Sequence, residues 1–214
     1  TNDCVGILDM STTWTRHTPL GQAAVIGMAH SIARGLPDIA PKAPLEIYAL
    51  GQPRVVYQGR ALQLPHRQIE ILCILALNPE GLTLEQFHAV LYGDAAVSTR
   101  TLKSELSHLR RLIGGHIGSR PYRLLMPVWA DFVEIWKSLH KQQADNALKL
   151  YRGPLLPKSV SPELEEWRSC IDAVMNKSLL DCEDTSMLIR QLNKRKNGSE
   201  LIRERLVDLL VYKP

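Results

Sequence analysis

The chain has 214 residues, 45% of them apolar and 22% charged, which is typical of one large or two small globular domains. This composition excludes a disordered polypeptide. No apolar run approaches the roughly 20 residues that a transmembrane helix needs, and the first residues lack the basic start of a signal peptide. With a net charge of only +4, we predict a cytoplasmic protein with no membrane partner.

The four cysteines are scattered and none belongs to a Cys-x-x-Cys pair, so the sequence suggests neither a zinc site nor a disulfide framework. Cys73 falls inside an apolar helical run and is expected to be a buried core thiol. The histidines show no spacing typical of metal ligands. We therefore expect no metal and no cofactor.

Residues 1–36 are predicted to be the end of a domain. They contain one β-prone run, CVGILDM, and one helix that begins after Thr18 and ends at Gly35. Apolar residues cover much of this helix, so it needs partners on more than one side, which a single strand cannot supply. Residues 37–44 contain three prolines and are predicted to be a stiff linker.

Residues 45–127 follow an order of strands, helices and a hairpin. The β-prone runs, separated by Gly and Pro turns, are 45–51, 54–58 and 60–65. The helices are 67–77, 84–91 and 98–113, and a hairpin is expected at 116–125. Thr83 and Gln86 have the spacing of a capping box before the second helix. This is the order of a winged helix-turn-helix with an N-terminal three-stranded sheet.

The helix predicted at 98–113 has two faces that need different neighbours. Its apolar stripe consists of Leu102, Leu106, Leu109 and Ile113. Its other face is basic and rich in hydroxyls, and the segment from Ser98 to Leu125 carries six basic residues against one acid, Glu105. A charged face is the usual solvent side of a surface helix. Such faces usually mix signs, so a polyanion-binding surface fits the pattern as well.

Residues 128–214 are predicted to be helical. Amphipathic helices are expected at 130–142 and 144–151, and a longer helix begins after the cap residue Ser161 and extends through Met175. Further helical patterns run to Leu210, with an interruption at Asn197-Gly198. There is no clean sequence repeat, but helical hairpins of this length are similar to solenoid units.

The sequence STRTLKSELSHLRRLI, followed by a hairpin that ends in YRLL, resembles the recognition helix and wing of OmpR-type winged-helix DNA-binding domains. The matching positions are Arg100, Thr101, Leu102, Leu106, Leu109, Arg110, Arg111, Leu112, Tyr122 and Arg123. Downstream, ALKLYRGPLLP and PELEEWRSCIDAV resemble the bacterial transcriptional activator domain, a tetratricopeptide-like helical module. These two resemblances cover about Leu45 to Met175. The stretch VGILDMSTTWTRHTPLGQAAVIGMAHSI is similar to the last strand and helix of a GAF sensor domain, as in AcoR-like regulators.

The resemblance implies a mainly α protein with a small β component and four parts. These parts are the tail of a GAF-like domain at 1–36, the linker at 37–44, an OmpR-type winged helix at 45–127 and a helical domain at 128–214. The implied function is that of a bacterial transcription regulator that binds specific DNA sequences, although no phospho-acceptor receiver domain precedes the winged helix. Because the chain does not begin with methionine, it could also belong to a longer protein.

In this family the helix at 98–113 would lie in the major groove and the hairpin at 116–125 would act as the wing. The residues assigned to DNA contact are Arg100, Thr101, Lys103, Ser104, Ser107, His108, Arg111, Arg120 and Arg123. The basic residues and Thr101 would hold phosphates, whereas Ser104 and His108 would approach base edges. The chain departs from the family at Pro121, where glycine is usual, and at His108, where arginine is common, so the resemblance does not define the operator.

Double-stranded DNA is the expected partner, a homodimer is the expected assembly, and RNA polymerase is a candidate contact of the helical domain. The alternative is a helical interaction scaffold whose winged helix does not read DNA. An enzyme is not predicted, because no GxSxG turn, Ser-His-Asp arrangement or carboxylate pair stands out. The glycine-rich segment 114–118 follows a helix, unlike a phosphate-binding loop. Trp129, Trp136 and Trp167 are expected to pack in the core, in preference to stacking on a ligand.

Overall fold

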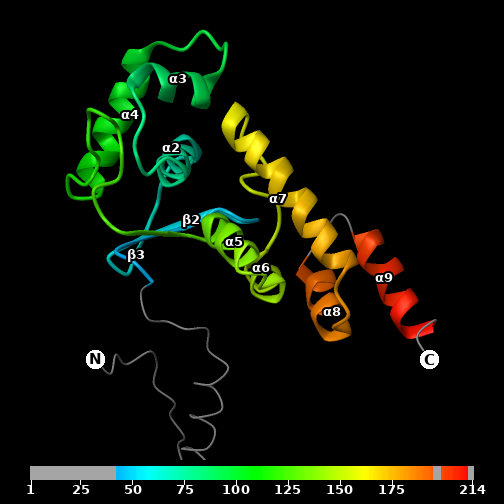
Figure 1. Cartoon of the computed structure of the whole chain (residues 1–214). Coiled ribbons are helices and arrows are strands. Elements are labelled where there is room, and N and C mark those ends of the chain that lie inside the picture. Colours follow the sequence, from blue (N-terminus) through cyan, green and yellow to red (C-terminus); the bar gives the residue numbers. More distant parts are fainter. Residues whose placement is uncertain (1–41, 195–198, 212–214) are drawn as a thin grey trace, which may run out of the picture. The chain divides into compact units, whose positions relative to one another are not determined.

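The computed structural model describes residues 42–194 and 199–211, so the elements expected within residues 1–36 lie outside it. The strands are β1 (Leu45–Tyr48), β2 (Arg54–Tyr57), β3 (Arg60–Leu62) and β4 (Val128–Ala130). The helices are α2 (His66–Leu77), α3 (Leu84–Tyr92), α4 (Thr99–Leu112), α5 (Asp131–His140), α6 (Ala144–Leu150), α7 (Pro162–Leu180), α8 (Thr185–Lys194) and α9 (Ser199–Val211). The predicted class, mainly helical with a small sheet before and beside a winged helix, is confirmed (Figure 1).

The sheet has four strands in the order β3-β2-β1-β4, one more than the sequence predicts. The pairs β1–β2 and β2–β3 are antiparallel, whereas β4 lies parallel to β1, with Val128 opposite Leu45 and Ala130 opposite Ile47. A strand of three residues shows no alternation that a sequence pattern can detect, and its partner lies about eighty residues earlier in the chain. Its formation depends on where the hairpin before it delivers the chain.

The helices of the winged-helix part form as the caps predict. The side chain of Thr83 accepts a hydrogen bond from the backbone N–H of Gln86, and the Gln86 side chain accepts one from the backbone N–H of Thr83, which is the expected capping box. Eight consecutive residues of α2, from Gln68 to Leu75, are buried, because α3, α4, α7 and β4 all pack against this helix. Cys73 is fully buried among them, as the sequence predicts.

The predicted hairpin at 116–125 is present in minimal form. The backbone N–H of Gly118 donates to the carbonyl of Arg123 at 2.8 Å, and that of Leu125 donates to His116 at 3.0 Å. Tyr122 also pairs with Leu82, the residue just before the cap of α3, in an antiparallel bridge. The hairpin is therefore anchored to the turn between α2 and α3 and projects beside α4 as a wing.

The helical half is built from helices that pack against their neighbours in the sequence. Helices α5 and α6 pack together, α8 and α9 pack together, and the long helix α7 packs against α6, α9, α2 and α3 (Figure 1). Ser161 caps α7 by accepting a hydrogen bond from the backbone N–H of Leu164, and Pro162 occupies the first helical position. Helix α7 thus joins the helical half to the winged helix.

Asp131, the first residue of α5, ties the two halves together through its carboxylate. Its oxygens accept hydrogen bonds from the backbone N–H groups of Ala49 at 2.9 Å, Leu50 at 3.1 Å and Phe132 at 2.9 Å. Burial raises the pKa of the Asp131 carboxyl, while these donated bonds act to lower it. The side chain is almost completely buried, so it acts as an internal clamp at the end of β1.

The segment before α7 adds further backbone pairing at the same place. Leu155 forms an antiparallel bridge with Leu50, the N–H of Leu156 donates to the carbonyl of Ala49, and the N–H of Gly51 donates to that of Pro154. The boundary predicted between residues 127 and 128 therefore falls directly before a strand and a loop that both pair with residues 45–51. The residues on its two sides share one buried core.

Candidate nucleic-acid interface

The start of α4 is held by two side chains. Ser98, the predicted cap, accepts a hydrogen bond from the backbone N–H of Thr101 at 3.3 Å, and its hydroxyl lies 3.2 Å from that of Thr101. On α3, Nε2 of His88 donates to the carbonyl of Val97 at 2.6 Å, which fixes the loop that leads into the helix. These hydrogen bonds fix the first turn of α4 and thereby the direction of the exposed side chains that follow it.

The apolar stripe of α4 is buried as predicted, since Leu102, Leu106, Leu109 and Ile113 are each at most 1% exposed. The nine residues that the sequence assigns to DNA contact are all exposed: Arg100, Thr101, Lys103, Ser104, Ser107, His108, Arg111, Arg120 and Arg123. Seven of them lie on α4 and two on the wing that follows it. The seven on α4 lie opposite its buried stripe, and the two on the wing follow within eleven residues of the helix end.

The exposed face of α4 carries unneutralised positive charge. Within the described part of the chain, Arg100, Lys103 and Arg111 take part in none of the ion pairs. Glu105, the acid of this helix, is half-buried and its carboxylate accepts a hydrogen bond from Gln68 on α2 at 2.9 Å. Because this carboxylate is held by α2, the cations keep their charge available for an anionic partner.

His108 is also held by Gln68, whose Nε2 lies 2.9 Å from its Nδ1. The same amide nitrogen donates to the Glu105 carboxylate, which can only accept, so the NH₂ group of Gln68 faces both residues. Nδ1 of His108 then acts as the acceptor, and the ring proton resides on Nε2. This arrangement presents an N–H donor toward solvent in a defined direction.

Arg110, which the sequence counts among the basic residues, serves a different purpose from its neighbour Arg111. Its Nε donates to the carbonyl of Ile117 at 2.7 Å and its Nη2 to that of Gly118 at 3.3 Å. These two bonds connect the last turn of α4 to the wing. Arg110 therefore orients the wing, whereas Arg111 extends freely from the helix.

Pro121, where the chain departs from the OmpR-type pattern, has a matched neighbour in Gly81. Gly81 has a φ of +94°, and a Cβ at this position would lie 2.7 Å from Cγ of Pro121. A side chain at residue 81 is therefore excluded both by backbone strain and by the ring. The departure at the wing is accommodated by the turn between α2 and α3.

Of the four tryptophans in the sequence, Trp136 and Trp167 pack against the core, whereas Trp129 does not, contrary to the prediction. Trp129 lies beside Tyr48 with a centroid distance of 5.0 Å and under the Nζ atom of Lys42 at 3.5 Å. Trp136 and Trp167 are half-buried; they touch the core as predicted but also border a cavity, which the sequence does not predict. Sequence reasoning likewise misses the link from Gln68 to His108, because these residues lie on separate helices and 40 positions apart.

Residues 42–194 and 199–211 contain no cluster of three or more histidine, cysteine, aspartate or glutamate side chains suited to a metal ion. Nor does any helix in these ranges have the length and apolar character required to cross a bilayer. The exposed face of α4 and the wing carry the exposed basic side chains Arg100, Lys103, Arg111, Arg120 and Arg123, and we take them as the candidate site.

No protein-family model matches the chain. It is 33% identical over 162 residues to an uncharacterised 47.3 kDa protein from the thcA 5′ region of Rhodococcus erythropolis. That alignment covers 75% of this chain and 37% of the relative, so the chain spans little more than a third of the relative's length. Among solved structures, it is similar to Mycobacterium tuberculosis EmbR in complex with a low-affinity phosphopeptide, with a TM-score of 0.47 and 18% identity over 78% of this chain and 55% of that one.

Proposed function

We propose that this chain is a transcription regulator that binds double-stranded DNA with α4 and the wing, as its resemblance to OmpR-type regulators implies. The observation that carries the proposal is the division of α4 into a fully buried apolar stripe and an opposite face of unpaired cations and short polar side chains. A helix of 14 residues is about 21 Å long, and a B-DNA major groove about 12 Å wide admits such a helix.

In this proposal the residues of α4 divide by chemistry. Arg100, Lys103 and Arg111 bind phosphates and set the register of the helix, with the hydroxyl of Thr101 beside them. Ser104, Ser107 and His108 face the bases. Arg120 and Arg123 reach phosphate or the minor groove from the wing, whose position Arg110 maintains.

The helical residues from 128 onward are proposed to assemble protomers or contact RNA polymerase. Large apolar side chains are exposed along α7, α8 and α9: Leu180, Ile189, Val207, Leu210 and Val211. Such residues favour a protein partner, and a second copy would place two winged helices on adjacent half-sites, which increases affinity through effective concentration. The same residues also support the alternative of a scaffold that does not read DNA, so the two are distinguished by DNA binding itself.

The first prediction concerns the salt dependence of binding to random-sequence duplex. Arg100→Ala and Arg111→Ala should each weaken binding and make the slope of log K against log salt shallower by about one unit, because each removes one phosphate contact. Fluorescence anisotropy across a potassium chloride series measures this slope. Lys149→Ala, which removes an exposed cation from α6, is the matched control and should leave the slope unchanged. A double Arg100/Arg111 variant that binds like wild type contradicts the assigned orientation, and a wild-type protein without salt-dependent binding favours the scaffold.

A second prediction concerns base preference. With its proton on Nε2, His108 should donate to a base-edge acceptor such as O6 or N7 of guanine. His108→Ala should reduce discrimination at one base pair by about 1 kcal/mol, without changing the salt slope. Gln68→Leu should weaken the same preference in part, because it releases the ring from its fixed orientation. Sequencing of duplexes selected by each variant measures the effect, and two variants with wild-type preference would exclude His108 from base reading.

A further inference from the structure

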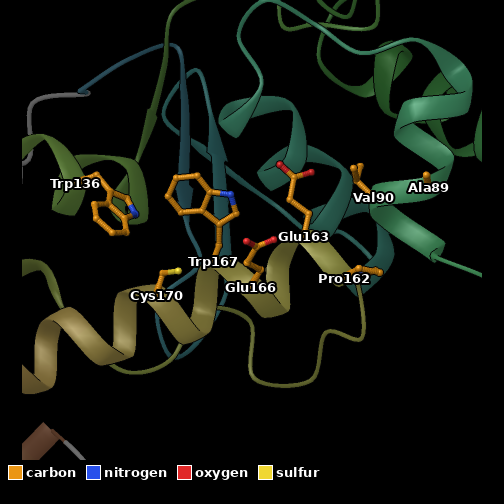
Figure 2. Close-up of a pocket in the computed structure, with 8 residues that line it drawn as sticks. All are labelled: Ala89, Val90, Trp136, Pro162, Glu163, Glu166, Trp167 and Cys170. Atoms are coloured by element: carbon orange, nitrogen blue, oxygen red, sulfur yellow. The ribbon is translucent and has the colours of Figure 1, made fainter.

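A cavity of about 690 Å³ lies where α3, α5 and α7 meet, and none of its lining residues belongs to α4 (Figure 2). Pockets that bind small molecules typically have volumes of about 300–1,000 Å³. Val90 of α3 and Pro162 at the start of α7 form an apolar wall, and Trp136 of α5 and Trp167 of α7 form an aromatic one. Glu163 and Glu166, both on α7, add two carboxylates to the lining, and Figure 2 shows them between the indoles and Val90. Ala89 and Cys170 are the remaining lining residues.

The two indoles offer surfaces that attract cations. Their ring centroids are 5.5 Å apart and their planes meet at 79°, so they stand edge to face. Both side chains are half-buried, which leaves part of each ring at the cavity. The face of an indole carries negative potential and attracts an ammonium group, more strongly where water is partly excluded. Nε1 of Trp136 is buried and donates no hydrogen bond within the described ranges, so an acceptor on an occupant would satisfy it.

The two glutamates add negative charge that the described residues do not compensate. Oε1 of Glu163 accepts a hydrogen bond from Nδ2 of Asn78 at 2.9 Å, but its Oε2 is buried without any partner in the described part of the chain. Burial raises the pKa of the Glu163 carboxyl, the Asn78 bond lowers it, and the neighbouring charge of Glu166 raises it further. Neither glutamate takes part in an ion pair within residues 42–194 and 199–211. A positive charge in the cavity would therefore relieve an existing electrostatic cost.

We propose that this cavity binds a small organic cation, an alkylammonium ion whose charged nitrogen lies between the indoles and the two carboxylates. Its alkyl substituents would contact Val90 and Pro162. A hard metal ion fits poorly, because Ca²⁺ and Mg²⁺ require six or more oxygen ligands and the wall is mainly indole and aliphatic carbon. An anionic ligand would be repelled by Glu163 and Glu166. This inference does not depend on DNA binding, so either can fail without the other.

Choline and 3,3-dimethyl-1-butanol, its uncharged isostere, are the probes that test the charge requirement. The four indole N–H signals of the full chain can be followed by NMR of the ¹⁵N-labelled protein, with Trp129→Phe, Trp136→Phe and Trp167→Phe to assign the three signals of interest. We expect choline to shift the signals of Trp136 and Trp167 with a Kd on the order of millimolar. The signal of Trp129, whose ring already faces Lys42, should stay in place. The isostere should bind at least about fivefold more weakly, because it lacks the cation–π attraction.

Matched variants test the carboxylates. Glu166→Gln should weaken choline binding about threefold to fivefold, as expected for the loss of one partly exposed ion pair. Glu165→Gln, at an exposed position that does not line the cavity, is the control and should bind choline like wild type. Thermal unfolding of each variant verifies that the fold is intact. Equal binding of choline and its isostere, unchanged binding by Glu166→Gln, or no shift of the two indole signals would each overturn the proposal.

Discussion

A chain that ends after Pro127 is expected to lose cooperative folding of the winged helix. The truncation removes β4 and exposes the edge of β1, and an unpaired strand edge promotes association between chains. It also removes many fully buried side chains, among them the four of Phe132, Leu155, Leu156 and Leu164. Each contributes about 1.5–3 kcal/mol when buried, and their sum of roughly 6–12 kcal/mol is comparable with the whole stability of a typical domain, about 5–15 kcal/mol.

Urea unfolding followed by circular dichroism distinguishes the outcomes. The complete chain should show a cooperative transition, and the fragment of residues 1–127 should show a broad transition or aggregate. A second truncation, after Lys194, keeps β4, Asp131 and α7 and should retain the transition of the winged helix. A cooperative 1–127 fragment that binds duplex DNA would demonstrate that the shared core is dispensable.

Replacement of Asp131 by alanine should be the most damaging single substitution at the junction. It leaves the N–H groups of Ala49, Leu50 and Phe132 without their acceptor in a buried place. Because each unsatisfied buried donor costs about 1–3 kcal/mol, we expect a loss of about 3 kcal/mol or more in the free energy of unfolding. Glu134→Ala removes an acid from the same helix, where its one ion pair within the described residues is with the exposed Lys137, and should cost about 0.5 kcal/mol.

Asp131→Asn removes the titratable group, and it also replaces one of the two accepting oxygens with an amide NH₂ that cannot accept a bond from the backbone. Its pH dependence, and not its stability at a single pH, is therefore the informative comparison. Since burial raises the pKa of the Asp131 carboxyl, the folded state binds its proton more tightly than the unfolded state does. The contribution of this group to stability should therefore grow as the pH falls from neutral through the raised pKa toward the ordinary value for aspartate. The asparagine variant does not titrate, so the difference between wild type and variant should shift in favour of wild type on acidification. A difference in free energy of unfolding that is constant with pH would contradict this assignment.

The helices and their buried faces could be predicted because they depend on local chemistry. Three helices begin after a predicted cap residue whose side chain accepts a hydrogen bond from a backbone N–H three residues later; these caps are Thr83, Ser98 and Ser161. The stripe of leucines on α4 follows from the 3.6-residue repeat alone. These signals are contained within one turn or one helix, so a single sequence displays them completely.

The features that were missed depend on the path of the chain between elements. Arg110 and Arg111 are adjacent and chemically identical, and only the course of the wing decides that the first holds carbonyls while the second stays free. Asp131 reads in the sequence as an ordinary acid at the start of a helix, which the helix dipole favours. Its three backbone donors include two from residues about eighty positions away. The contact between Trp136 and Trp167 likewise joins two helices, α5 and α7, and no pattern within either helix predicts that they are neighbours.

The parallel pairing of β4 with β1 has a consequence for how segments of this chain can be exchanged with those of a relative. A crossover between two genes placed at Pro127, where the sequence suggests a seam, would join one parent's β1 to the other parent's β4 and Asp131. In the chimaera, β1 and β4 would come from different parents, and so would Asp131 and the backbone N–H groups of Ala49 and Leu50 that donate to it. Exchange of the winged helix alone would have to leave residues 45–51 with their own 128–131 and 154–156 and replace only the helices and wing between residues 51 and 128. The segment that can be exchanged, from α2 to the wing, is therefore an insertion. The residues before it and after it, 45–51 and 128–131, pair with each other and must come from the same parent.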